Sequence, residues 1–176
     1  MDNKLPIDLN EKVYIRNAGL VLLNPFFTTY FNRLGMLEND LFINHEARMR
    51  AVHLLQYLVD GASDNPEPLL VLNKLLCSIP VEEPVIPGIT LTEQEKRVSE
   101  ELLNAVISRW DKLKNTSVAG LQNSFLQRDG ALYFKDDAWR LKVEPRGYDV
   151  LLQTLPWSIG TIKTPLRHNV LYVEWI

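Results

Sequence analysis

The first 37 residues of the chain are unusually apolar and predict two short buried helices. Residues 18–23 form an apolar run, and Asn17 lies where a side chain caps a helix N-terminus. Large apolar side chains then recur at helical spacing over residues 26–34. Asn24 precedes this second segment as a candidate cap, and Pro25 occupies its first helical position, where a missing N–H costs nothing.

The middle of the chain predicts three further helices, with a proline-rich segment before the last of them. Residues 44–59 show an apolar face at helical spacing, and residues 68–79 are apolar nearly all round, which is typical of a buried helix. Residues 80–88 contain three prolines and predict an extended arm. Residues 92–95 then form a capping box, which opens the longest expected helix, to about Lys112.

The pattern changes after another short helix, expected at residues 117–127. Apolar and polar residues alternate on both sides of residues 135–137, which predicts a β-hairpin. The last run, residues 169–176, alternates in the same way and predicts a third strand that pairs with the hairpin around residues 139–143. Helices followed by strands indicate an α+β fold with a small antiparallel sheet.

Length and composition indicate a single globular domain over residues 1–176, helical over about 13–127 and β-rich over about 128–176. The 176 residues are 46% hydrophobic, which argues against disorder. The net charge is −3 without a basic stripe, so we expect no nucleic-acid partner. We also expect no signal peptide and no membrane insertion. The single cysteine, Cys77, lies in an apolar run and indicates a buried thiol in a reducing compartment.

Residue types that serve catalysis and metal binding are present, but their spacing is poor for either purpose. His45 and His53 lie about two helical turns apart without a third ligand, so we expect no bound zinc. The acidic pairs at 82–83 and 136–137 are adjacent in loops rather than placed across a cleft, as glycosidases require. Neither a Gly-rich phosphate loop nor a G-x-S-x-G turn is present. We therefore predict a non-catalytic protein without a cofactor.

Several strings in order along the chain resemble the C-terminal domain of the tape measure proteins of contractile injection systems. Their order and spacing agree from about Val13 to Trp175, which makes the match specific although each string alone is weak. The strings are Tyr14–Phe26, Arg50–Leu58, Leu70–Cys77, Leu113–Ser117, Ser124–Arg128, Asp149–Leu152, Leu155–Ile159 and Val173–Trp175.

The resemblance implies a structural role in assembling a phage-tail-like particle, in which a contractile sheath surrounds an inner tube on a baseplate. The implied partners are inner tube, baseplate or hub, and cap proteins, with a homo-oligomer as a further option. The implied location is the cytoplasm during assembly and then the particle. Two alternatives stay open: a small adaptor or chaperone for a particle component or cargo, and, less favoured, an enzyme that acts on the cell wall.

Tape measure proteins usually carry a long N-terminal ruler, and this chain shows no such segment. A folded domain of this size spans only a fraction of the length that the same residues would reach as one helix. We therefore expect either a terminal domain of a longer protein or a short member of the family that keeps the attachment role.

Under this resemblance, the residues that stand out are polar groups set inside apolar strings. Asn73, Lys74 and Asn115 are of this kind. For the two asparagines we favour a structural role, in which they satisfy buried backbone groups as caps do, over direct contact with a partner. Arg128 and Arg140 flank the expected hairpin and are expected to face either an acidic partner or solvent.

Overall fold

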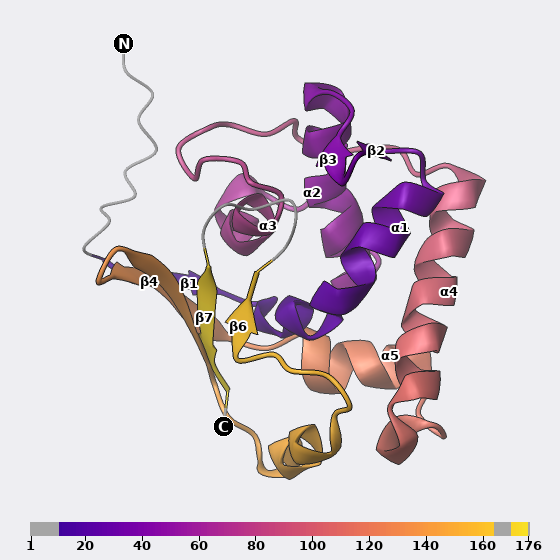
Figure 1. Cartoon of the computed structure of the whole chain (residues 1–176), viewed down its shortest axis with the longest axis vertical. Coiled ribbons are helices and arrows are strands. Elements are labelled where there is room, and N and C mark those ends of the chain that lie inside the picture. The colour runs from indigo at the N-terminus through magenta and orange to yellow at the C-terminus, as the bar shows by residue number, and fades with distance from the viewer. Residues whose placement is uncertain (1–10, 164–169, 176) are drawn as a thin grey trace.

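The computed structural model describes residues 11–163 and 170–175 and shows an α+β fold, as the sequence predicts (Figure 1). The α-helices are α1 (Phe27–Arg33), α2 (His45–Asp60), α3 (Val71–Leu76), α4 (Glu93–Arg109) and α5 (Val118–Leu121). The 3-10 helices are η1 (Ala18–Phe26), η2 (Glu67–Leu69), η3 (Asp111–Leu113) and η5 (Gly147–Thr154), and η4 (Gln122–Leu126) is a π-helical turn. The strands are β1 (Val13–Ile15), β2 (Leu37–Glu38), β3 (Leu41–Phe42), β4 (Gly130–Lys135), β5 (Ala138–Val143), β6 (Thr161–Ile162) and β7 (Leu171–Glu174).

The expected hairpin and third strand are both present, in a sheet of five strands ordered β1-β4-β5-β7-β6. β4 and β5 form the hairpin, and Asp136 and Asp137 between them both adopt positive φ, as a tight hairpin turn requires. β7 pairs with β5 over residues 139–142. The ends of the expected strand, Asn169 and Ile176, lie outside the described residues.

The sheet is mixed, so the expectation of a purely antiparallel sheet is wrong. β7 runs parallel to β5 because the chain does not turn back directly after β5. It passes through η5 and β6 first, and β6 pairs antiparallel with β7 on the side away from β5. Parallel neighbours need a long connection of this kind, which residue alternation does not reveal.

Strands also occur inside the part of the chain expected to be helical. β1 lies at its start and pairs antiparallel with β4, and β2 and β3 form a small separate hairpin. The turn of this hairpin contains Asn39 and Asp40, both at positive φ. Strands of two or three residues are too short to produce a readable periodicity, which explains why the sequence pattern misses them.

Side-chain caps begin the two longest helices, and the sequence predicted one of them, the capping box of α4. Asn44 Oδ1 accepts a hydrogen bond from the Ala47 N–H at 2.8 Å at the start of α2. Thr92 Oγ1 accepts from the Glu95 N–H at 3.1 Å, and Glu95 Oε1 accepts from the Thr92 N–H at 2.8 Å, which completes the capping box of α4. Gly61 ends α2 with φ of 73°.

The N-terminal helices differ from the expectation. Residues 18–26 form one 3-10 helix with Pro25 inside it, and α1 begins at Phe27, so Asn24 caps no helix. Asn17 makes no cap either. Its side-chain amide instead donates to Gln56 Oε1 at 2.8 Å and to Asn73 Oδ1 at 2.7 Å in the interior. A buried amide without such partners would be costly, so these hydrogen bonds stabilise Asn17 in the interior.

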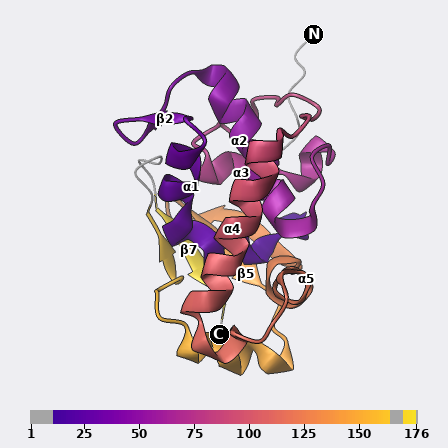
Figure 2. The same ribbon diagram turned by 90° about the vertical axis from the view of Figure 1, so that its right-hand side faces the viewer.

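The helices pack in a layer against one face of the sheet. Figure 2, turned by 90°, shows α4 running along the helical side, where it contacts α1, α2 and α5. η1 crosses η4 so closely that a Cβ on Gly19 would lie 1.7 Å from the Phe125 carbonyl oxygen. Trp110, Trp139 and Trp175 are buried in the core that joins the two layers.

Candidate interaction surface

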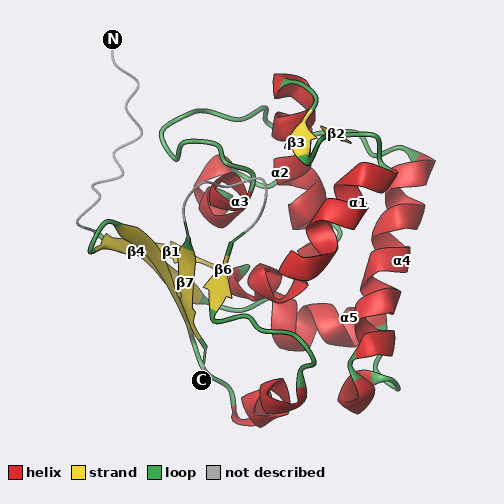
Figure 3. Ribbon diagram, viewed as in Figure 1, coloured by secondary structure: helices red, strands yellow, loops and turns green. Residues whose placement is uncertain are grey.

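The outer face of the five-stranded sheet is not covered by any described helix (Figure 3). Side chains alternate across a strand, so Leu132, Leu141 and Leu171 point toward the helices and are buried. The residues between them point outward. We call the outward residues of β1, β4, β5 and β7 away from the β4–β5 turn, together with Lys12 next to β1, the outer sheet face: Lys12, Tyr14, Ala131, Tyr133, Arg140, Lys142, Tyr172 and Glu174.

Cations and tyrosines alternate along one row of this face. Tyr133 is opposite Arg140 across β4 and β5, and Arg140 is opposite Tyr172 across β5 and β7. The Arg140 guanidinium lies 4.9 Å from the centroid of the Tyr172 ring, and the Lys12 Nζ lies 5.7 Å from that of Tyr133. Cation–π contacts orient these cations without neutralising them, so their charge stays available to a partner.

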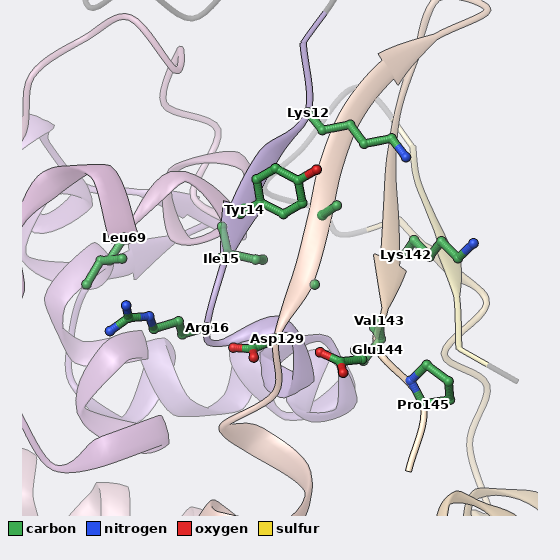
Figure 4. Close-up of a pocket in the computed structure, with 12 residues that line it drawn as sticks. Lys12, Tyr14, Ile15, Arg16, Leu69, Asp129, Lys142, Val143, Glu144 and Pro145 are labelled. Atoms are coloured by element: carbon green, nitrogen blue, oxygen red, sulfur yellow. The ribbon is translucent and has the colours of Figure 1, made fainter.

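The neighbouring row contains a depression of about 630 Å³ (Figure 4). Ala131 is directly opposite Tyr14 on one side and Lys142 on the other. Because Ala131 carries only a methyl group, the surface is hollow between these two long side chains. Asp129 and Glu144 line the lower end of the hollow as Figure 4 presents it. The Tyr14 side chain is 76% exposed, so a large aromatic ring projects from the rim.

The residues of the outer sheet face carry more positive than negative charge, although the chain carries a net charge of −3. They comprise Lys12, Arg140 and Lys142 against Glu174, which is directly opposite Lys142. Two further carboxylates, Asp129 and Glu144, line the end of the hollow. Tyrosine and arginine are enriched among the residues that dominate binding energy at protein interfaces. The chemistry of this face therefore suits an acidic protein surface.

Arg140 is the residue singled out from the sequence that lies on this face. The structure does not bring the five selected residues together: Arg128, Asn73 and Lys74 are buried inside the molecule, and Asn115 is exposed between η3 and α5.

Arg128 is 1% exposed, and the acidic group it faces is Asp149 of the same chain. Its guanidinium pairs with both carboxylate oxygens and also donates to the Glu144 carbonyl oxygen at 2.9 Å. The rings of Tyr148 and Trp175 lie 5.2 and 5.4 Å from the guanidinium. This cluster joins the end of η4 to η5 and to the C-terminal strand.

The pKa of Asp149 is held below its ordinary value by this cluster. Burial by itself would raise that pKa. Hydrogen bonds from the Arg128 guanidinium, the Arg146 N–H and the Trp175 indole outweigh the effect of burial. The carboxylate is therefore stabilised in its charged form.

Asn73 and Lys74 join segments within the helical layer. The Asn73 amide donates to the Val52 carbonyl oxygen of α2 at 2.9 Å, so it satisfies a buried backbone group in mid-helix. Lys74 Nζ lies 2.7 Å from Glu67 Oε1 and donates to the Val81 carbonyl oxygen at 3.1 Å. These contacts hold α3 against α2 and against the proline-rich arm.

The tyrosines of the outer sheet face were not identified from the sequence. Tyr133 and Tyr172 occupy the polar positions of the expected strands, so the alternation that located Arg140 could also have found them. Tyr14 gave no such signal, because β1 has only three residues and was expected to be part of the helical region.

The described residues contain no group of three or more His, Cys, Asp or Glu side chains placed to hold a metal ion. His45 is exposed beside Glu83, at 3.3 Å, and His53 is buried with Nε2 at 2.6 Å from the Ile86 carbonyl oxygen. Burial raises the pKa of the Cys77 thiol, which makes it a poor nucleophile. Within residues 11–163 and 170–175, no helix has the length and apolar character to cross a bilayer.

Comparison with known proteins gives one family. A family model described as "Contractile injection system tape measure protein" matches residues 2–175, which is nearly the whole chain. No curated protein and no solved structure matches the chain.

Proposed function

The chain belongs to the contractile injection system tape measure protein family, and from this premise we propose that it is a non-catalytic assembly protein that docks through its outer sheet face. The partners we propose are tube, baseplate or hub, or cap components. Docking takes place during assembly in the cytoplasm and persists in the finished particle.

The observation that carries the proposal is an open sheet face with three tyrosines and three cations. Tyr14 and Tyr172 are large aromatic side chains exposed to solvent. Exposed apolar surface of this kind commonly marks a protein interaction site. Exposed cations beside aromatic rings supply both the apolar contact and the orientation that a specific interface needs. An acidic surface on a tube, baseplate or cap protein would complement them.

The face, rather than an edge, of the sheet is the docking surface. β1 and β6 form the two edges and have three and two residues. β1 also contacts α3. Short and partly covered edges of this kind prevent the addition of a partner strand.

The test replaces Tyr14 and Tyr172 by serine and Lys142 by glutamate in the full chain. We expect incorporation into purified particles to fall by about tenfold or more, because interface tyrosines commonly contribute ~2 kcal/mol or more each. Val150→Ser is the matched control, since Val150 is an exposed apolar residue on η5 away from this face.

Three results distinguish the parts of the proposal. Full incorporation of the triple variant, with an unchanged melting temperature, would contradict docking through this face. Absence of the wild-type chain from purified particles would contradict the assembly role itself. A map of the assembled particle by electron cryomicroscopy would identify the neighbour that contacts Tyr14.

A further inference from the structure

A second surface lies away from the sheet, beside the β2–β3 hairpin. It is a groove of about 760 Å³ between this hairpin, the start of α2 and the proline-rich arm of residues 80–88. In Figure 1 the hairpin lies at the upper end of the molecule, and the five-stranded sheet lies lower and to the left. The two surfaces share no residue.

Apolar side chains line the groove and also lie next to it. Met36, Met49 and Val85 line it together with Ile43 and Ile86. Ile43 is 51% exposed, Ile86 is 41% exposed, and neighbouring Leu41 on β3 is 56% exposed. Exposed aliphatic side chains gathered around a hollow are typical of a binding site.

Glu46 lines the groove, and three further exposed carboxylates lie in the segments next to it: Glu38 and Asp40 in the hairpin and Glu82 in the arm. We call these four residues the acidic rim. None of these four carboxylates has an ion-pair partner among the described residues. The partial positive charge at the start of α2 is offset by Glu46 in its first turn.

The two basic side chains in the lining do not counter this acidity. Arg50 forms a bidentate pair with Glu95, and the His45 imidazole lies beside Glu83. The pKa of Glu95 is lowered: burial would raise it, but hydrogen bonds from Arg50 and from Thr92 outweigh burial. Arg50 is therefore already paired, and Glu46 is a charged residue of the lining without an ion-pair partner among the described residues.

The wall of the groove is held in place before any partner binds. The Ile86 carbonyl oxygen can only accept, so His53 Nε2 donates to it at 2.6 Å. Glu67 Oε1 accepts from the Val85 N–H at 2.8 Å while it pairs with Lys74. Arg50 donates to the Thr90 carbonyl oxygen at 2.8 Å. A preformed wall lowers the entropy lost on binding.

We propose that this groove binds a basic amphipathic segment of another component, with apolar side chains in the hollow and Lys or Arg residues against the acidic rim. Charge complementarity and the apolar lining favour this occupant. The chain then connects two partners of opposite character, an acidic one at the outer sheet face and a basic one at the groove. The groove can bind its partner whether or not the outer sheet face docks.

The test uses a labelled synthetic peptide of leucine and lysine with one apolar face, ~18 residues long, about five helical turns. Fluorescence anisotropy with the full chain measures its affinity. We expect binding that weakens about tenfold in Ile43→Gln/Ile86→Gln and in Glu46→Lys, and that weakens as salt is raised. Both isoleucines are exposed, so the fold should tolerate glutamine, and the melting temperature checks this.

Two controls separate this site from general attraction. Glu100→Lys makes the same charge change as Glu46→Lys but at an exposed position on α4, and a leucine–glutamate peptide has the same apolar face with the opposite charge. Equal loss of affinity in Glu100→Lys, or equal binding of the acidic peptide, would overturn the proposal. So would a concentration-dependent dimer of the free chain that Ile43→Gln abolishes, because the occupant would then be a second copy.

Discussion

Arg128 shows how one residue can connect distant parts of the chain. Its guanidinium contacts aromatic rings from η4, η5 and the C-terminus, and it pairs with Asp149. A cation buried in this way is stable only while its carboxylate partner is charged and present. The stability that the Arg128–Asp149 pair contributes therefore depends on pH.

Asp149→Asn should lower the free energy of unfolding by about 3–5 kcal/mol at neutral pH, because it leaves the buried guanidinium without a counter-charge. The folded-state pKa of Asp149 lies below its unfolded value of about 3.9. Its stabilising contribution is thus fully present above pH ~4 and is lost as the pH falls through the folded-state pKa. Urea unfolding at pH 7 and near pH 3 should show the difference between variant and wild type shrinking in acid.

Glu174→Gln is the control for this measurement, since it makes the same carboxylate-to-amide change on the exposed sheet face. It should change the unfolding free energy by less than about 0.5 kcal/mol at either pH. A difference between Asp149→Asn and wild type that stays constant with pH would show that the pair does not titrate as described.

β7 is the element on which the C-terminal part of the fold depends most. It is the inner strand between β5 and β6, so it supplies pairing to both. It also leads to Trp175, whose indole donates to Asp149 at 3.1 Å. The strand and the Arg128 cluster therefore stabilise each other.

Deletion of residues 171–176 should abolish cooperative unfolding or lower the melting temperature severely. The deletion removes β7, with which both β5 and β6 pair, and exposes apolar side chains of the core. The loss approaches the ~5–15 kcal/mol stability of a whole domain. Circular dichroism melts provide the measurement. An unchanged midpoint would show that the segment is dispensable for folding.

Trp175→Phe tests the contribution of the Trp175 indole N–H to stability while β7 stays in place. It keeps an aromatic ring in the core and removes the indole N–H, so we expect a loss of about 1–3 kcal/mol rather than unfolding. A variant as unstable as the truncated chain would mean that the hydrogen bond, and not the strand, is the main contribution.

The whole molecule presents two surfaces of opposite charge on a common core. The outer sheet face is cationic and aromatic, and the groove is apolar with an acidic rim. The linings of the sheet hollow and of the groove share no residue, and the buried network of Asn17, Gln56 and Asn73 belongs to neither. The two surfaces should therefore respond to substitution independently.

A chain that combines Tyr14→Ser/Tyr172→Ser/Lys142→Glu with Ile43→Gln/Ile86→Gln tests this independence. Its change in unfolding free energy should equal the sum of the two separate changes within about 0.5 kcal/mol. The sheet variant alone should bind the leucine–lysine peptide within about twofold of wild type. Non-additivity above about 1 kcal/mol in urea unfolding would mean that the surfaces are coupled through the core.

Strong local patterns were sufficient to predict most elements. The capping box at Thr92, the helical spacing of α2 and α4, and the alternation on both sides of Asp136 depend on neighbours within a few residues of each other. Such interactions are determined by the order of residues along the chain, so the α+β class and the order of elements could be predicted. The order of matching strings likewise indicated the family, and the family match confirms it.

Contacts between distant residues decided the rest. Asn17 satisfies a buried amide network instead of a helix end, and β7 lies parallel to β5 because a long connection returns it there. Local sequence could not distinguish Arg128, which is buried against Asp149, from Arg140, which is on the outer sheet face. The location of each arginine depends on which segments pack around it, because burial and pairing are properties of the folded chain rather than of any window of sequence.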